Sequence, residues 1–72
     1  MKPYGHRKSG VVAYELHDDA IDIKFANGDV YRYDATTPGP VDLELMKRFA
    51  RAGRGLTTYI SKYVRDRYAE KL

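Results

Sequence analysis

Apolar and polar residues alternate in three short segments of the first half of this 72-residue chain. Residues 11–16 read VVAYEL, residues 21–25 read IDIKF and residues 29–34 read DVYRYD. A period of two is typical of a strand with one buried face. Short segments rich in turn-forming residues, 17–20 and 26–28, connect them. The pattern predicts three strands joined as an antiparallel meander.

The period changes after the segment TTPGP at 36–40, where Pro40 suits the first position of a helix. Apolar residues then recur every three or four positions, which predicts a helix over 41–52 that stops at Gly53. Its expected buried stripe is Val41, Leu45, Phe49 and Ala52, with Met46 at the margin. A second helix is expected after the hinge at 54–55, with a stripe of Leu56, Ile60, Tyr63 and Val64 flanked by Tyr59.

These elements predict one small domain. Each helix and the sheet would leave an apolar surface in water if it stood alone, so they are expected to pack together. The predicted fold class is α+β: a three-stranded antiparallel β-meander followed by two helices packed on one sheet face (β-β-β-α-α). Residues 1–8 are expected to form a flexible N-terminal lead-in, and 9–72 the domain.

The loop before the third strand decides which face Tyr31 and Tyr33 occupy. A two-residue loop at 27–28 would put Arg32 on the apolar face, whereas a three-residue loop over 26–28, with Gly28 in the left-handed conformation, would place both tyrosines there. We favour the three-residue loop, because it keeps that face apolar and sets Arg32 opposite Asp22. Tyr31 and Tyr33 are then predicted to be core residues and not an exposed base-stacking surface.

Charge divides the chain into two unequal parts. The net charge is +3, but residues 1–46 carry five Lys and Arg against eight Asp and Glu, whereas residues 47–72 carry eight against two. The second part, with a balance of +6, would raise the local concentration of a polyanion. The absence of cysteine excludes disulfides and Cys-based zinc sites and favours a reducing, cytoplasmic location. No apolar run is long enough for a signal sequence or a membrane span.

Catalytic or metal-binding patterns are lacking in the sequence. His6 and His17 do not have the i, i+4 spacing of a helical metal pair. Ser9 and Ser61 have no neighbouring histidine to activate them. We therefore expect no enzymatic activity, no cofactor and no metal.

Several residues between 9 and 68 resemble the KTSC domain family. They are Ser9-Gly10, Tyr14, Phe25, Gly28, Val30-Tyr31-Arg32-Tyr33, Gly55, Tyr59 and the closing Val64-Arg65-Asp66-Arg67-Tyr68. The family is named for the C-terminal domain of some lysyl-tRNA synthetases and also occurs as a small free-standing bacterial or phage protein of uncharacterised role. The resemblance implies RNA binding through that association. Gly10, where serine is expected, and the segment AGRG at 52–55, where Ser-x-Gly is usual, depart from the family pattern.

The resulting hypothesis is a non-catalytic domain that binds nucleic acid, RNA in preference to DNA, through a basic helix-hinge-helix face. Its predicted binding residues are Lys47, Arg48, Arg51, Arg54, Gly55, Lys62, Arg65 and Tyr68. The alternative is a protein-interaction or self-association module that uses an apolar patch of Val11, Ala13, Ala26 and Val30 on the other sheet face. A ribbon-helix-helix arrangement from residue 29 is disfavoured, because the third strand is expected to pair within this meander.

Overall fold

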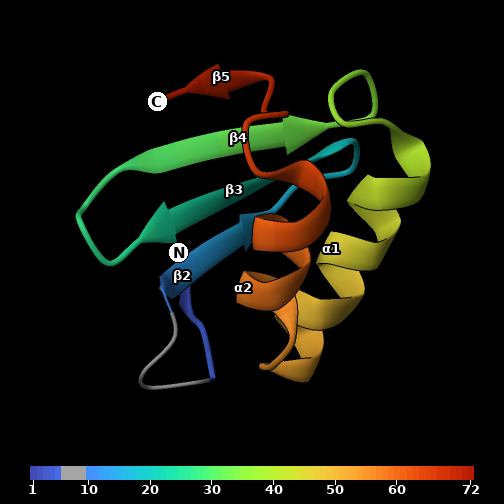
Figure 1. Ribbon diagram of the computed structural model, residues 1–72. Coiled ribbons are helices and arrows are strands. Elements are labelled where there is room, and N and C mark those ends of the chain that lie inside the picture. Colours follow the sequence, from blue (N-terminus) through green and yellow to red (C-terminus); the bar gives the residue numbers. More distant parts are fainter. Residues whose placement is uncertain (6–9) are drawn as a thin grey trace.

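The computed structural model describes residues 1–5 and 10–72 and has an α+β fold, with a five-stranded antiparallel sheet and two helices (Figure 1). The strands lie in the order β1-β2-β3-β4-β5 across the sheet. Their bounds are β1 Lys2–Pro3, β2 Val11–Leu16, β3 Ala20–Phe25, β4 Val30–Asp34 and β5 Glu70–Lys71. The helices are α1 (Pro40–Ala52) and α2 (Leu56–Tyr59), and α2 continues into a π-helical turn, η1 (Ile60–Val64). No helix in the described parts of the chain is long and apolar enough to span a bilayer.

The predicted meander corresponds to β2, β3 and β4, and the loop register is confirmed. Ile23 lies opposite Tyr31, and Asp22 lies opposite Arg32. The Phe25 N–H donates to the carbonyl of Asp29 at 2.8 Å, and Gly28 has φ 94. The turn therefore contains three residues, and its geometry selects the tyrosine-inward face of β4.

Two short edge strands were not predicted. Each contains two residues, too few to show a period. β1 pairs with β2, and β5 pairs with β4. A strand lies on each side of β4, so β4 is not a free ribbon available to a partner, as a ribbon-helix-helix protein would require.

Part of the segment expected to be a flexible lead-in pairs with the sheet and packs against the core. Lys2 and Pro3 form β1, and Tyr4 is buried. The hydroxyl of Tyr4 accepts a hydrogen bond from the Leu56 N–H at 3.0 Å, which ties this segment to the start of α2. His6 and Ser9, which the sequence singled out, lie outside the described residues.

A register irregularity in β2 corrects the assignment of its faces. The pairing with β3 shifts between Val11 and Ala13, as in a β-bulge. Val11 is consequently buried in the core and Val12 is exposed, the reverse of strict alternation. The apolar patch expected on the outer sheet face therefore lacks Val11 and keeps only Ala13, Ala26 and Val30, which are partly or fully exposed.

Helix α1 begins at Pro40 and ends before Gly53, as predicted, but its buried stripe is different. Leu43, Met46, Lys47 and Ala50 face the core, whereas Val41 is 73% exposed. Both stripes have helical spacing, so the apolar pattern alone could not choose between them. In the second helix Leu56, Ile60 and Val64 are buried, but Tyr63 is 61% exposed.

Both helices lie on the same side of the sheet (Figure 1). That side carries Ile21, Ile23 and Tyr33, all of which are almost fully buried. Within the part of the chain that the structure describes, no helix covers the opposite face of the sheet (Figure 1). These two faces supply different chemistry.

Candidate nucleic-acid interface

Four aromatic rings form a continuous wall at one end of the helix-facing side. The ring centroids of Phe25 and Tyr31 are 5.6 Å apart, those of Tyr31 and Tyr68 are 4.5 Å apart, and those of Tyr33 and Tyr68 are 6.4 Å apart. Tyr68 reaches this position because β5 follows it and pairs with β4. Residues from two strands and from the C-terminal segment thus meet in one cluster.

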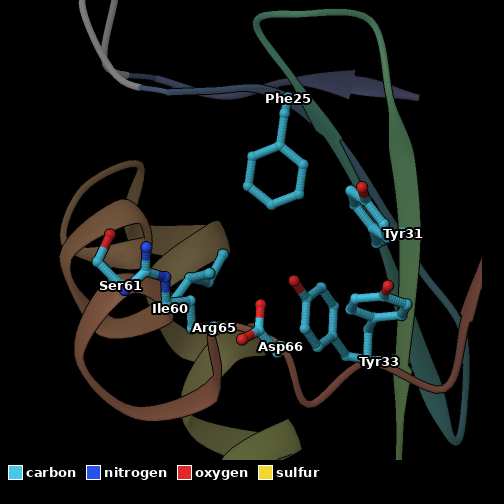
Figure 2. Close-up of a pocket in the computed structure, with 8 residues that line it drawn as sticks. Phe25, Tyr31, Tyr33, Ile60, Ser61, Arg65 and Asp66 are labelled. Atoms are coloured by element: carbon cyan, nitrogen blue, oxygen red, sulfur yellow. The ribbon is translucent and has the colours of Figure 1, made fainter.

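The wall borders a pocket of about 310 Å³. Phe25, Tyr31 and Tyr33 form its sheet side, and Ile60, Ser61 and Arg65 form its helical side, with Asp66 between them (Figure 2). The side chains of Arg65 and Asp66 are exposed, and no hydrogen bond or ion pair joins either of them to another described residue. Two opposite charges are therefore available to a ligand in an aromatic pocket.

Tyr33 is the most deeply buried ring of this cluster. It is only 1% exposed. Burial, followed by the nearby Tyr31, Tyr68 and Asp66, raises the pKa of Tyr33 to about 12. At neutral pH its hydroxyl is therefore protonated and adds no negative charge to the pocket.

Lys47 must be removed from the predicted interface. It is 5% exposed, and its Nζ donates to the carbonyl oxygens of His17 at 2.6 Å and Asp18 at 2.9 Å. A buried ammonium needs such partners to offset its lost hydration. This lysine joins α1 to the β2–β3 turn, and its charge is not presented to a ligand.

Arg48 and Arg51 are exposed on α1, but Arg51 lies on the side away from α2. The side chain of Asp42 accepts a hydrogen bond from the Tyr59 hydroxyl, so this face of α1 meets α2. Asp42 and Arg51 are nine residues apart, which separates them by about 180° around an α-helix. The expected continuous face across the two helices is therefore divided.

The hinge has a packing role. Gly55 has φ 88, and a Cβ there would lie 2.9 Å from the Phe49 ring. Glycine is required by both the backbone conformation and this close approach. Arg54 is exposed beside it. Gly55 thus positions α2 against α1.

Three further predicted binding residues lie at the second helix or the pocket. Lys62 is in η1, and Arg65 and Tyr68 line the pocket. Lys62 and Arg65 are exposed, whereas Tyr68 is 37% exposed with its ring against Tyr31. Two other cations of the basic segment are engaged. Arg67 donates to the Pro38 carbonyl at 2.7 Å, and the Lys71 ammonium lies 3.6 Å from a carboxylate oxygen of Asp29.

The pocket residues that the sequence did not assign to the site are Phe25, Tyr31, Tyr33, Ile60, Ser61 and Asp66. Alternation correctly placed the strand aromatics on the helix-facing side. It could not show that the helices leave a pocket over them, because that depends on the rotation of each helix and on the return of Tyr68. Within the sequence, the closing Val-Arg-x-x-Tyr was the available signal for Arg65 and Tyr68.

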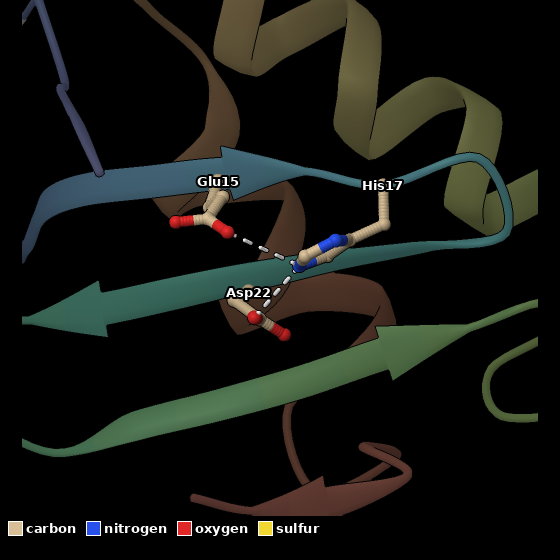
Figure 3. Close-up of side chains that lie close together, drawn as sticks. All are labelled: Glu15, His17 and Asp22. Carbon is tan, nitrogen blue, oxygen red and sulfur yellow. Dashed lines mark hydrogen bonds and ion pairs between the residues drawn. The ribbon is translucent and has the colours of Figure 1, made fainter.

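The outer sheet face carries a separate charged cluster (Figure 3). Asp22 is 5% exposed, and both its oxygens are bound by Arg32, at 2.7 and 2.9 Å. His17 Nε2 lies 2.9 Å from Asp22 Oδ2 and 3.7 Å from Glu15 Oε2. The hydrogen bonds from Arg32 lower the pKa of Asp22 despite its burial.

Glu15, His17 and Asp22 offer three metal-ligand atoms within 4.8 Å of one another. The sequence discounted His17 because it lacks a helical partner, but Glu15 comes from β2, which ends just before His17, and Asp22 comes from β3. A metal would have to compete with Arg32 for Asp22. The cluster in its present arrangement is a hydrogen-bonded ion network.

Comparisons with family models, with curated protein sequences and with solved structures find no match to this chain.

Proposed function

We propose that this domain binds single-stranded nucleic acid, RNA in preference to DNA, without catalysing a reaction on it. The observation that carries the proposal is the aromatic pocket beside Arg65, within the basic part of the chain. The interface is centred on this pocket instead of on the outer surface of α1. Residues 9–72 would form the domain that resembles the KTSC family.

A single strand fits this chemistry because its bases are free to leave the stack. Aromatic rings bind unstacked bases with about 1–3 kcal/mol per base. The half-buried Tyr31 and the more exposed Tyr68 offer such surfaces in a pocket that a base pair within a duplex would not reach. Arg65, Lys62 and Arg54 would attract the phosphates, and such contacts position the strand without reading its sequence.

The preference for RNA rests on the resemblance to domains that accompany some lysyl-tRNA synthetases. A single-stranded loop or end of an RNA presents unstacked bases, which proteins bind by aromatic stacking and edge contacts. We therefore expect single-stranded RNA to bind more tightly than single-stranded DNA or duplex DNA.

Titration of fluorescently labelled single-stranded RNA at several salt concentrations tests the proposal. Binding should weaken as salt rises, because cations on the protein displace condensed counterions. Arg65→Glu should reduce the affinity and the salt slope, and Arg51→Glu, with the same charge change on the far side of α1, should have a smaller effect. Absence of binding at about 50 mM salt, where phosphate contacts are strong, would contradict the proposal.

A protein partner is the second candidate, favoured by a different surface. Pro40, Val41 and Leu45 border a shallow apolar groove on α1, and Val41 is 73% exposed. Exposed apolar patches are common at protein interfaces. Sedimentation over a range of concentrations would detect self-association, and Val41→Asp should abolish it if this groove forms the contact. A monomer at every concentration would exclude self-association.

A further inference from the structure

We infer that the aromatic pocket is a subsite for a guanine base, read by the adjacent side chains of Asp66 and Arg65. The inference rests on the proposed function and specifies its base preference. It follows from the polar groups on the helical side of the pocket, because aromatic stacking accepts every base and cannot discriminate strongly.

Asp66 provides two acceptor oxygens. Its carboxylate points between the sheet and helix sides of the pocket (Figure 2). Its proximity to the buried Tyr33 helps to raise the pKa of that phenol, which places the negative charge next to the aromatic wall. An ionised carboxylate accepts hydrogen bonds and donates none.

Guanine is the base whose edge matches a carboxylate with two donors. Its N1–H and N2 amino group lie side by side and can reach both oxygens of one carboxylate. Adenine and cytosine offer a donor beside a ring acceptor, and uracil offers one N–H between two carbonyls. A carboxylate facing any of these three bases would therefore meet a lone pair as well as a donor.

Arg65 completes the match. Its guanidinium carries only donors and lines the same pocket. Guanine presents O6 and N7 as neighbouring acceptors, which arginine commonly binds as a pair. Arg65 and Asp66 are adjacent in the chain, and neither side chain has a hydrogen-bond partner among the described residues. Together they can thus offer donors and acceptors to one base. The aromatic side of the pocket would support its ring.

The test compares labelled uridine oligomers of about ten nucleotides that carry one central guanosine, inosine, adenosine or uridine. One guanosine should increase the affinity about tenfold over adenosine or uridine, as expected for a paired contact. Inosine should give an intermediate affinity, because it keeps N1–H and O6 but lacks the amino group.

Asp66→Asn should remove the guanosine preference while leaving the affinity for the uridine oligomer unchanged or higher, since one repulsive charge is lost. Glu44→Gln is the matched control: it removes one exposed negative charge from α1, away from this pocket, and should retain the preference. Equal affinities for the four oligomers, or a preference that survives Asp66→Asn, would overturn the guanine assignment and leave single-strand binding intact. No binding to any oligomer would overturn both proposals.

Discussion

At the scale of single residues, the two tyrosines of the segment VYRYD have different roles. Tyr33 is 1% exposed, whereas Tyr31 is half-buried and lines the pocket. The sequence placed both on the core side, which the register confirms. It could not separate them, because their exposure depends on where the helices end above the sheet.

Substituting the two tyrosines should therefore separate stability from binding. Tyr33→Ala should cost about 3–5 kcal/mol of unfolding free energy, because it leaves a cavity in the core. Tyr31→Ala should cost less and should weaken RNA binding in a protein that still folds. Urea denaturation and RNA titration of both variants measure this. Equal destabilisation by the two substitutions, with unchanged binding for Tyr31→Ala, would contradict the division.

Lys47 gives a second prediction at this scale. Lys47→Met keeps most of the buried stem but leaves the carbonyls of His17 and Asp18 without their donor. We expect a loss of about 1–3 kcal/mol of stability, the cost of unsatisfied buried polar groups. RNA affinity, measured where the variant is folded, should be unchanged. A fall in affinity at full stability would return Lys47 to the interface.

Asp22 should make the stability of the protein depend on pH. Its pKa is lowered from 3.8, mainly by the hydrogen bonds from Arg32. The unfolded state therefore binds this proton first, so the stabilisation is present above pH 3.8 and is lost as the pH falls through the lowered folded-state value. The stability difference between the wild type and Asp22→Asn, measured by urea denaturation, should shrink across that acidic range. A difference that does not vary there would contradict the assignment.

At the scale of elements, local sequence patterns predicted the turn register and the helix ends. They did not predict the rotation of α1 or the pairing of the edge strands. The Ala26-Asn27-Gly28 turn fixed the register of β3 and β4, and Pro40 and Gly53 marked the ends of α1. The predicted buried stripe of α1 was wrong, because the sequence offers two stripes with helical spacing and the one that is buried contains a lysine. β1, β5 and the irregularity in β2 depend on contacts between distant segments that no local pattern encodes.

The hinge glycine provides a prediction at this scale. Gly55→Ala should destabilise the protein by more than about 1 kcal/mol, because it combines a left-handed backbone with a close approach to Phe49. Gly28→Ala is the matched control: it also has positive φ, but nothing lies within 4 Å of the added carbon. Thermal melts should show the larger loss for Gly55→Ala. Equal losses would mean that the contact with Phe49 has no energetic consequence.

At the scale of the whole molecule, the fold separates two kinds of chemistry. The open face of the sheet holds the Glu15, His17, Asp22 and Arg32 network, and the helix-facing side ends in the aromatic pocket. The basic charge of residues 47–72 is distributed over both sides of α1, the hinge and the second helix. Charge alone therefore does not define the proposed interface, which we place at the pocket.

The most direct test of this location is an amide chemical-shift titration of the protein with a short single-stranded RNA at low salt. The amides of Phe25, Tyr31, Ser61, Arg65, Asp66 and Tyr68 should shift together and saturably, while those of Glu15 and Arg51 change little. Absence of shifts, or saturable shifts confined to the outer sheet face or to the far side of α1, would contradict the account.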